Sequence, residues 1–297
     1  MIVPVVAPPV ASSTTTAGLV AAFVVGLFGL GAVVLAVGTH FGRLDARTAW
    51  GRFALEFGIV AFVAVPPAFG VTAVRATAAP LVAVLVLEVA AVGGLPRGMR
   101  GVLASLVAAV SVVDVPPAIP MALAVVSPLV LGLAVAGVRH AVIGLAVVAP
   151  WAFGSTLVAL ARTEHAVVAV DSAYAVLETS DSAAYLLGGA FGRTLFWPRV
   201  STKKTRTGVI AALVTGALVG GVAAPLLFGT SPLVGGVVGT AGASAASAAD
   251  LATSALKRKL GCKDFAAWMP HHGSASDAYD SLIFVLPLWM LVRAILG

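Results

Sequence analysis

The chain has 297 residues, of which 60% are hydrophobic and only 10% are charged. A soluble globular protein carries about 25% charged residues, so this composition excludes an ordinary soluble domain and favours a lipid bilayer around the apolar segments. The net charge of +6 comes without a basic stripe interleaved with exposed aromatics, which argues against a nucleic-acid partner. The one cysteine, Cys262, excludes an intrachain disulfide and a cysteine metal cage.

Residues 1–18 lack a basic region before their apolar run, and they are predicted to form a short tail rather than a cleaved signal peptide. Apolar runs long enough to cross a bilayer then follow along the chain. They occupy 18–38, 53–73, 78–96, 101–118, 121–138, 140–161, 208–229, 232–251 and 281–296.

A less apolar run, 166–190, contains Asp171, Glu178 and Asp181. We expect a broken or cavity-lining helix there, because charged side chains at membrane depth need protein or water around them. The sequence therefore predicts an all-α, polytopic integral membrane protein with nine or ten transmembrane helices. Residues 1–165 form an N-terminal group of transmembrane helices, and residues 166–297 form a C-terminal region that carries the polar motifs.

The distribution of basic residues tests this layout, because short cytoplasmic loops are enriched in Lys and Arg. With the N-terminus outside and each run crossing once, fifteen cations face the cytoplasm and three face out, which are Arg75, Arg162 and Arg293. The two long polar loops, 192–207 and 252–280, fall on the cytoplasmic face. We therefore expect a multi-pass protein of the cell membrane with its polar site on the cytoplasmic side.

Small residues are dense throughout the chain, as in 216–221 and 235–242. Such residues allow helices to approach closely in lipid. A glycine-rich phosphate loop is the functional alternative, but no lysine follows at the required spacing. The pattern therefore favours helix packing.

Charge is concentrated in three motifs of the C-terminal region. In the first, a polar run precedes the helix predicted from residue 208, and its hydroxyls and ammonium groups suit oxygen-rich anions. A basic loop that only sets topology is the alternative. The residues of this motif are Asp181, Ser201, Lys203, Lys204 and Thr205.

In the second motif, Asp250, Ser254 and Lys257 lie on one face of a helix, and the carboxylate is a candidate Mg²⁺ ligand. In the third, Asp277 and Asp280 are three residues apart and repel each other unless a cation lies between them or one is protonated. A helix cap is the alternative role for either aspartate.

Other polar groups carry weaker signals. His271 and His272 could bind a metal, but without a further partner a structural or phosphate-facing role is favoured. Further acids in apolar runs could mark a proton or ion path, although no membrane-buried basic residues match them. These acids are Glu56, Glu88, Asp114 and Asp171.

Taken in order and spacing, the motifs resemble the phosphatidate cytidylyltransferase (CDP-diacylglycerol synthase) family of integral membrane enzymes. The family signature Ser-x-x-Lys-Arg, Lys-Asp, Pro-x-His-Gly-Gly-x-x-Asp-Arg-x-Asp is matched by Ser254, Lys257, Arg258, Lys263, Asp264, Pro270, His272, Gly273, Asp277 and Asp280. The upstream Gly-Asp-Leu, Asp-Thr-Gly-Ala-Tyr and Lys-Lys-Thr elements are matched by Asp250-Leu251, Asp181 to Tyr185 and Lys203-Lys204-Thr205. In motif detail the resemblance covers 180–281.

The chain departs from the family at four positions. Thr207 and Thr253 stand where the family has glutamates, Ala278 where it has an arginine, and Ser274 where it has a second glycine. These changes bear on the rate, the metal arrangement and the choice of lipid more than on the fold.

The resemblance implies cytidylyl transfer from CTP to phosphatidate or a related lipid phosphate, with release of diphosphate, in phospholipid biosynthesis. It implies that Asp250 and Asp277 hold Mg²⁺, with support from Asp280 or Asp181 and room for a second cation. The remaining motif residues would bind substrate phosphates through charge or hydrogen bonds: Lys203, Lys204, Lys257, Arg258, Lys263, Ser201, Thr205, Ser254, Asp264 and His272. The family also implies a homodimer among membrane lipids.

Two alternatives remain open. A CTP-dependent lipid or polyprenol kinase would transfer the γ-phosphoryl group, but it gains nothing from the long C-terminal signature. A membrane transporter or non-catalytic scaffold has no use for this set of aspartates and lysines at the family's spacing.

Overall fold

The computed structural model describes residues 46–163, 166–201, 204–270 and 273–296, together with single positions between 18 and 40. These residues are mostly helical, and the only β-structure among them is two isolated bridges. The elements in chain order are α2 (Ala46–Ala64), the 3₁₀ helix η1 (Pro66–Phe69), α3 (Val71–Val92), α4 (Arg97–Ser111), α5 (Ala118–Ala136), α6 (Arg139–Ala161), α7 (Ala166–Phe191), α8 (Arg206–Phe228), α9 (Pro232–Lys259), α10 (Ala275–Ala278) and α11 (Leu282–Leu296).

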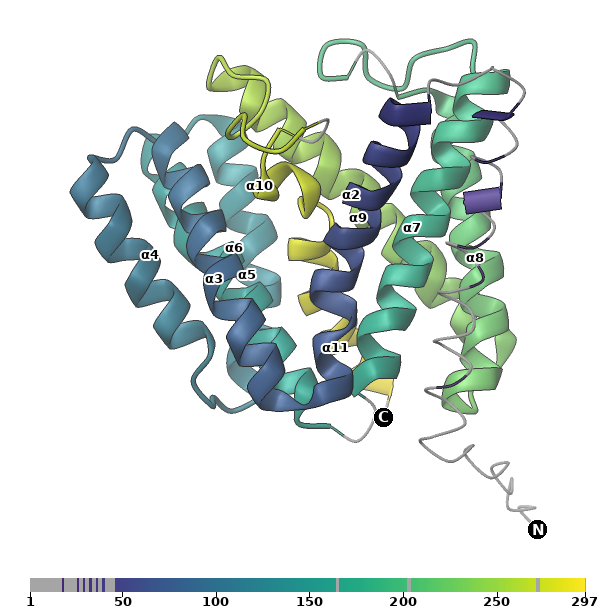
Figure 1. The fold of residues 1–297 in the computed structure, drawn as a ribbon, viewed down its shortest axis with the longest axis horizontal. Helices are drawn as coiled ribbons and strands as arrows, with labels where there is room; N and C mark the ends of the chain where they lie inside the picture. Colours follow the sequence, from purple (N-terminus) through teal and green to yellow (C-terminus); the bar gives the residue numbers. More distant parts are fainter. Residues whose placement is uncertain are drawn as a thin grey trace.

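The long helices run up and down in one bundle (Figure 1). Five of them, α3, α5, α6, α8 and α9, are long and apolar enough to cross a membrane. The predicted count of nine or ten spans is not confirmed. Helices α4 and α11 have 15 residues each, and the sequence of α7 includes three acids. The predicted span 18–38 lies outside the described residues except at single positions.

The structure differs from the predicted layout at two places. The predicted runs 53–73 and 78–96 do not match the helices, because the chain turns sharply between the end of α2 at Ala64 and the start of α3 at Val71. Pro66 and Pro67 lack the N–H groups that would continue α2, and Gly70 adopts a φ of 86° that favours glycine. The break considered for 166–190 is also absent, because α7 is one continuous helix of 26 residues.

The two sides of the bundle are packed differently. Helices α3 and α6, with α11, enclose large apolar side chains such as Leu85, Phe153 and Leu286, which are fully buried. Helices α8 and α9 instead meet through glycines: a Cβ added to Gly216 would lie 2.7 Å from the carbonyl oxygen of Gly239. The expectation that small residues serve helix packing is therefore confirmed for this pair.

We call the two ends of the bundle the polar end and the far end. The polar end comprises the α7–α8 connection (192–205), the last turns of α9 and the connection 260–281, at the top of Figure 1. The far end comprises the start of α3, the α4–α5 connection and the end of α6. There Asp114 pairs with Arg75 and with Arg162, the latter at 2.9 Å.

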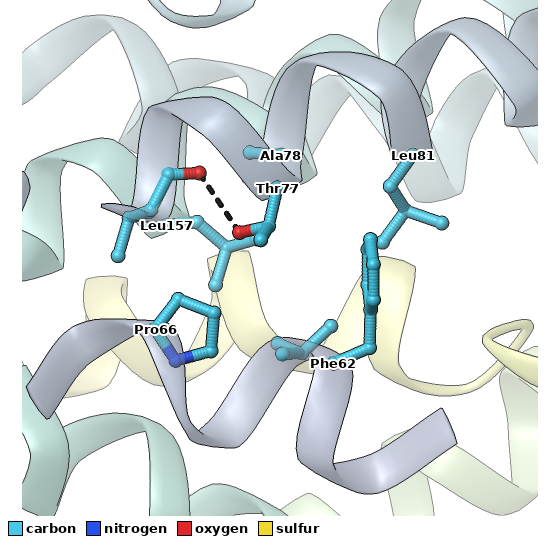
Figure 2. Close-up of a pocket in the computed structure, with 8 residues that line it drawn as sticks. Phe62, Pro66, Thr77, Ala78, Leu81 and Leu157 are labelled. Carbon is cyan, nitrogen blue, oxygen red and sulfur yellow. Dashed lines mark hydrogen bonds between the residues drawn. The ribbon is translucent and has the colours of Figure 1, made fainter. Parts of the chain in front are cut away.

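A small apolar pocket lies toward the far end, between α2, η1, α3 and α6 (Figure 2). Its one polar side chain, Thr77, donates a hydrogen bond to the Val74 carbonyl of its own helix at 3.1 Å. The pocket therefore offers no charge to a phosphate. Its lining residues are Phe62, Val63, Pro66, Val74, Thr77, Ala78, Leu81 and Leu157.

Candidate functional site

The entry to α8 is built by Thr205 and by close glycine packing. The Thr205 hydroxyl accepts a hydrogen bond from the Gly208 N–H at 3.1 Å, which makes Thr205 the N-cap of α8. The same hydroxyl donates to the Gly188 carbonyl of α7 at 3.4 Å. A Cβ on Gly208 would lie 2.8 Å from the Ala184 carbonyl oxygen, so the helices touch here. Thr205 thus fixes where the preceding lysine is presented, and its predicted bond to phosphate stays a prediction.

The Lys204 ammonium group forms an ion pair with the Asp250 carboxylate of α9. The side chains are 27% and 29% exposed, so water and ligands can reach the pair. The Ser254 hydroxyl, one turn further along α9, donates to Asp250 at 3.3 Å. The structure therefore joins two of the sequence motifs, from the α7–α8 connection and from α9, at one point of the polar end.

A second ion pair, between Lys257 and Asp277, lies deeper in the polar end. The Lys257 Nζ donates to Asp277 Oδ1 at 2.7 Å, and the side chains are 10% and 6% exposed. The other oxygen, Asp277 Oδ2, accepts from the Ser274 hydroxyl at 2.6 Å and from the Phe265 N–H at 3.0 Å. The Lys257 Nζ also lies 5.5 Å from the centre of the Phe265 ring. Both Asp277 oxygens are therefore engaged by the protein itself.

Asp280 follows α10 and faces α9. Its carboxylate accepts a hydrogen bond from the Thr253 hydroxyl at 3.1 Å. The pKa of Asp280 is raised to about 7, mainly by burial and also by the negative charge of Asp250, against the lowering effect of Lys257. Asp250 and Asp280 are thus close enough to repel each other, as expected for two carboxylates that share a site.

The remaining predicted residues lie around these contacts. Asp181 is exposed on α7 and interacts electrostatically with Lys204 and Asp250. Ser201 is half-buried in the α7–α8 connection, without a side-chain contact that assigns it a role. Lys203 and His272 lie outside the described residues.

Three residues of the signature lie toward the edge of the polar end. Arg258 is exposed and donates to the Cys262 carbonyl at 3.5 Å, and Lys263 is exposed. Asp264 packs against Gly273, where a Cβ would lie 2.7 Å from the Asp264 Cβ and where φ is +83°. The structure does not bring these three side chains to the two ion pairs.

Sequence reasoning missed Glu88 as a residue of this region. Glu88 belongs to α3 and is 6% exposed, and its carboxylate accepts hydrogen bonds from three N–H groups of 268–276. The only signal in the sequence was an isolated acid in an apolar run, interpreted as part of a proton or ion path. These contacts give Glu88 a structural partner instead.

The chemistry available to the site is charge neutralisation rather than covalent catalysis. Burial raises the pKa of the Cys262 thiol, and the charge of Asp277 raises it further, so this thiol is not an activated nucleophile. Two lysines and three aspartates instead present charged groups from the α7–α8 connection, α9 and the connection 260–281. Such a set suits binding and orientation of phosphate groups.

The site's carboxylates fit a hard divalent cation held jointly with a substrate. Among the described residues, no group of three or more His, Cys, Asp or Glu side chains is placed to hold a metal alone. Mg²⁺ is commonly bound through one or two carboxylates together with substrate phosphates and water. The repulsion between Asp250 and Asp280 is the kind of contact that such a cation would relieve.

Comparison with known proteins identifies the family to which this sequence is similar. A profile of the cytidylyltransferase family matches residues 46–296. The chain is 34% identical to a phosphatidate cytidylyltransferase of Aquifex aeolicus over 113 residues, which are 38% of this chain and 42% of that protein. It is 33% identical to a phosphatidate cytidylyltransferase of Bacillus subtilis over 128 residues, 40% of this chain and 45% of that protein.

A third relative is an uncharacterized Escherichia coli protein, YnbB, 35% identical over 119 residues, which are 39% of each chain. The aligned segments thus span less than half the length of the curated relatives they match. The family profile, in contrast, covers most of the chain and includes every element from α2 to α11. This chain is a member of the cytidylyltransferase family.

Proposed function

We propose that the protein transfers the cytidylyl group of CTP to phosphatidate or a closely related lipid phosphate, which yields CDP-diacylglycerol and diphosphate. A lipid phosphate oxygen forms a bond to the α-phosphorus of CTP, the bond between that phosphorus and the β-phosphate oxygen breaks, and diphosphate leaves. The relatives named phosphatidate cytidylyltransferase support this substrate pair. The site's contacts support the chemistry independently.

The observation that carries the proposal is the pairing of Lys204 with Asp250 and of Lys257 with Asp277 at one end of an apolar bundle. Each lysine is held by a carboxylate, and the Lys204 pair is accessible. In this proposal Lys204 binds triphosphate oxygens, and Lys257 neutralises charge closer to the lipid phosphate. Phosphoryl and nucleotidyl transfer depend mainly on such positioning and charge neutralisation.

Asp250 and Asp280 would hold Mg²⁺, which supplies positive charge to the phosphate oxygens when it is bound. The predicted pairing of Asp250 with Asp277 remains a prediction. The contacts favour Asp280 instead, because both Asp277 oxygens already accept hydrogen bonds from Lys257, Ser274 and Phe265. Asp277 would then orient the Lys257 ammonium group.

The polar end is proposed to face the cytoplasm, where CTP is available, and the protein to reside in the cell membrane. The support is the bias of basic residues toward this end and the clustering of Arg75 and Arg162 at the far end. A homodimer, as implied by the family, is part of the same proposal.

The test is diphosphate release by purified protein in mixed micelles that contain CTP, Mg²⁺ and phosphatidate. We expect release that requires both the lipid and Mg²⁺ and is lost in Asp250→Asn. Formation of CDP and a phosphorylated lipid would instead establish the kinase alternative. Absence of any CTP turnover with intact, monodisperse protein would contradict the enzyme proposal and favour a transporter or scaffold.

A further inference from the structure

The structure places an acceptor-only group beneath the turn that carries two of the site's aspartates. The Glu88 carboxylate accepts from the Trp268 Nε1–H at 2.6 Å and the Ala275 N–H at 3.1 Å through Oε1, and from the Ser276 N–H at 2.7 Å through Oε2. All three partners are donors. A carboxylate, which has no hydrogen to donate, is the side chain that satisfies this arrangement.

The burial of Glu88 makes these hydrogen bonds important. Glu88 lies on α3, a helix that is long and apolar enough to cross a membrane, and is 6% exposed. A buried carboxylate without partners is costly, and so is a buried N–H without an acceptor. The three hydrogen bonds satisfy both the carboxylate and the N–H groups, so the connection 260–281 and α3 stabilise each other across 180 or more positions of the chain.

The anchored turn leads directly to the charged site. Ala275 and Ser276 are the first residues of α10, which is capped by the Ser274 hydroxyl. Asp277 lies one residue beyond the anchor and contacts Lys257. Asp280 lies at the end of the same turn, between α10 and α11. A shift of the anchor would therefore move both carboxylates relative to α9.

A second contact holds the same turn from another side. The Tyr279 hydroxyl donates to the Ile59 carbonyl of α2 at 2.7 Å. This bond is neutral and single, whereas Glu88 supplies a charged acceptor for three donors. Bonds to ionised groups are roughly twice as strong as neutral ones. Tyr279 is therefore a matched, weaker anchor within the same element.

We propose that Glu88 is a positioning residue for the reaction: its carboxylate fixes the turn 274–281 so that Asp277 orients Lys257 and Asp280 faces Asp250. This inference rests on the proposed cytidylyl transfer. Glu88 contacts none of the side chains assigned to substrate, so it acts through the backbone of α10. Mispositioning of catalytic groups by about 1 Å can cost about 100-fold in rate.

The test compares Glu88→Gln, Glu88→Asp and Tyr279→Phe in the full-length protein. Glutamine keeps the shape but turns an NH₂ group toward at least one N–H donor. We expect kcat to fall by about 10- to 100-fold in Glu88→Gln, with the KM for CTP changed by less than about threefold, since no CTP-binding group is removed. Tyr279→Phe should lose less than about tenfold, as expected for one neutral hydrogen bond.

Hydrogen exchange supplies a readout that does not depend on activity. We expect amide exchange in peptides covering 273–281 to be faster in Glu88→Gln than in wild type, while peptides from α8 keep wild-type exchange. Glu88→Asp keeps an acceptor-only group that is one methylene shorter, and it should show the same two effects at smaller size. It also carries the test if Glu88→Gln does not fold.

Unchanged exchange in 273–281 would overturn the anchoring role. Faster exchange with an unchanged kcat, or a loss confined to KM, would overturn the positioning role in the reaction. A wild-type protein without transfer activity would contradict the proposed function instead, and the exchange experiment would still decide whether Glu88 holds the turn.

Discussion

The two ends of the bundle use the same kinds of side chain in different surroundings. At the far end, Asp114 pairs with two arginines, and the three side chains are 35–53% exposed. At the polar end, Lys257 and Asp277 are 10% and 6% exposed. Exposed ion pairs contribute little to stability, whereas a buried pair costs desolvation energy that its own attraction barely offsets. The far-end ion pairs thus connect the start of α3, the α4–α5 connection and the end of α6 at the surface, whereas the polar end keeps a buried ion pair that stability alone does not explain.

The largest expected effect separates the two ends by activity. Asp280→Asn should lower transfer by at least about 100-fold, because it removes a proposed metal ligand's charge with little change in volume. Asp114→Asn is the matched control at the far end and should keep activity within about twofold, because its ion pairs are exposed. Diphosphate release at saturating CTP measures both. Equal losses in the two variants would mean that the ends do not differ in function.

The next effect separates the ends by stability. Lys257→Met should destabilise the folded protein by about 3–5 kcal/mol, because it leaves the Asp277 carboxylate buried without its cation. Arg162→Met should cost no more than about 1 kcal/mol, because its side chain is 53% exposed. Thermal unfolding in detergent, calibrated by a denaturant series, compares the two. The double variant Lys257→Met/Asp277→Asn should recover part of the loss, and a purely additive double variant would contradict a dehydrated pair.

The smallest effect concerns pH. Burial raises the pKa of Asp280 from 3.8 to about 7, so between these values the folded state binds a proton that the unfolded state releases. The free energy of unfolding should therefore fall as pH rises from about 4 to about 7 and then level off. The melting temperature of metal-free protein between pH 5 and 8 measures this decline.

Two variants locate the source of that decline. Asp280→Asn should make the decline shallower and should be more stable than wild type at pH 8, and the remaining decline should come from Asp171 of α7, because burial also raises the pKa of Asp171 to about 7. Asp114→Asn should leave it intact, because a hydrogen bond from Arg75 lowers the pKa of Asp114 and its titration lies below this range. A decline as steep in Asp280→Asn as in wild type would assign the titration to groups other than Asp280.

Much of the charged cluster at the polar end was predictable from the sequence, because few other residues of the chain are charged. In a chain with 10% charged residues, Lys204, Asp250, Lys257 and Asp277 stand out against apolar helices, and the structure pairs them. Their partners were not predictable in the same way. The spacing of Asp277 and Asp280 suggested a shared cation, but only the fold shows that Asp277 is engaged by Lys257 and Ser274.

Other features depended on contacts that no local pattern encodes. Glu88 meets its donors 180 or more positions along the chain, and an isolated acid in an apolar run does not indicate its partner. The turn between α2 and α3 was not predicted from hydrophobicity, because Ala, Val and Phe continue through it. Only Pro66, Pro67 and Gly70 indicate the break between the helices. The confirmed part of the fold prediction is a helical membrane protein, while the span count depended on such boundaries.

The glycine contacts between α8 and α9 limit which amino-acid substitutions this chain can accept during evolution. Lys204 precedes α8 and Asp250 belongs to α9, so the distance between these two helix axes sets the gap that their side chains must close. At Gly216 even one added methyl group would meet the backbone of α9, 2.7 Å away. An alanine at Gly216 should therefore disturb the distance between Lys204 and Asp250, whereas substitutions at exposed positions of α8 such as Leu218 should leave it unchanged. The tolerance of this helix pair to mutation should therefore alternate from one face of each helix to the other.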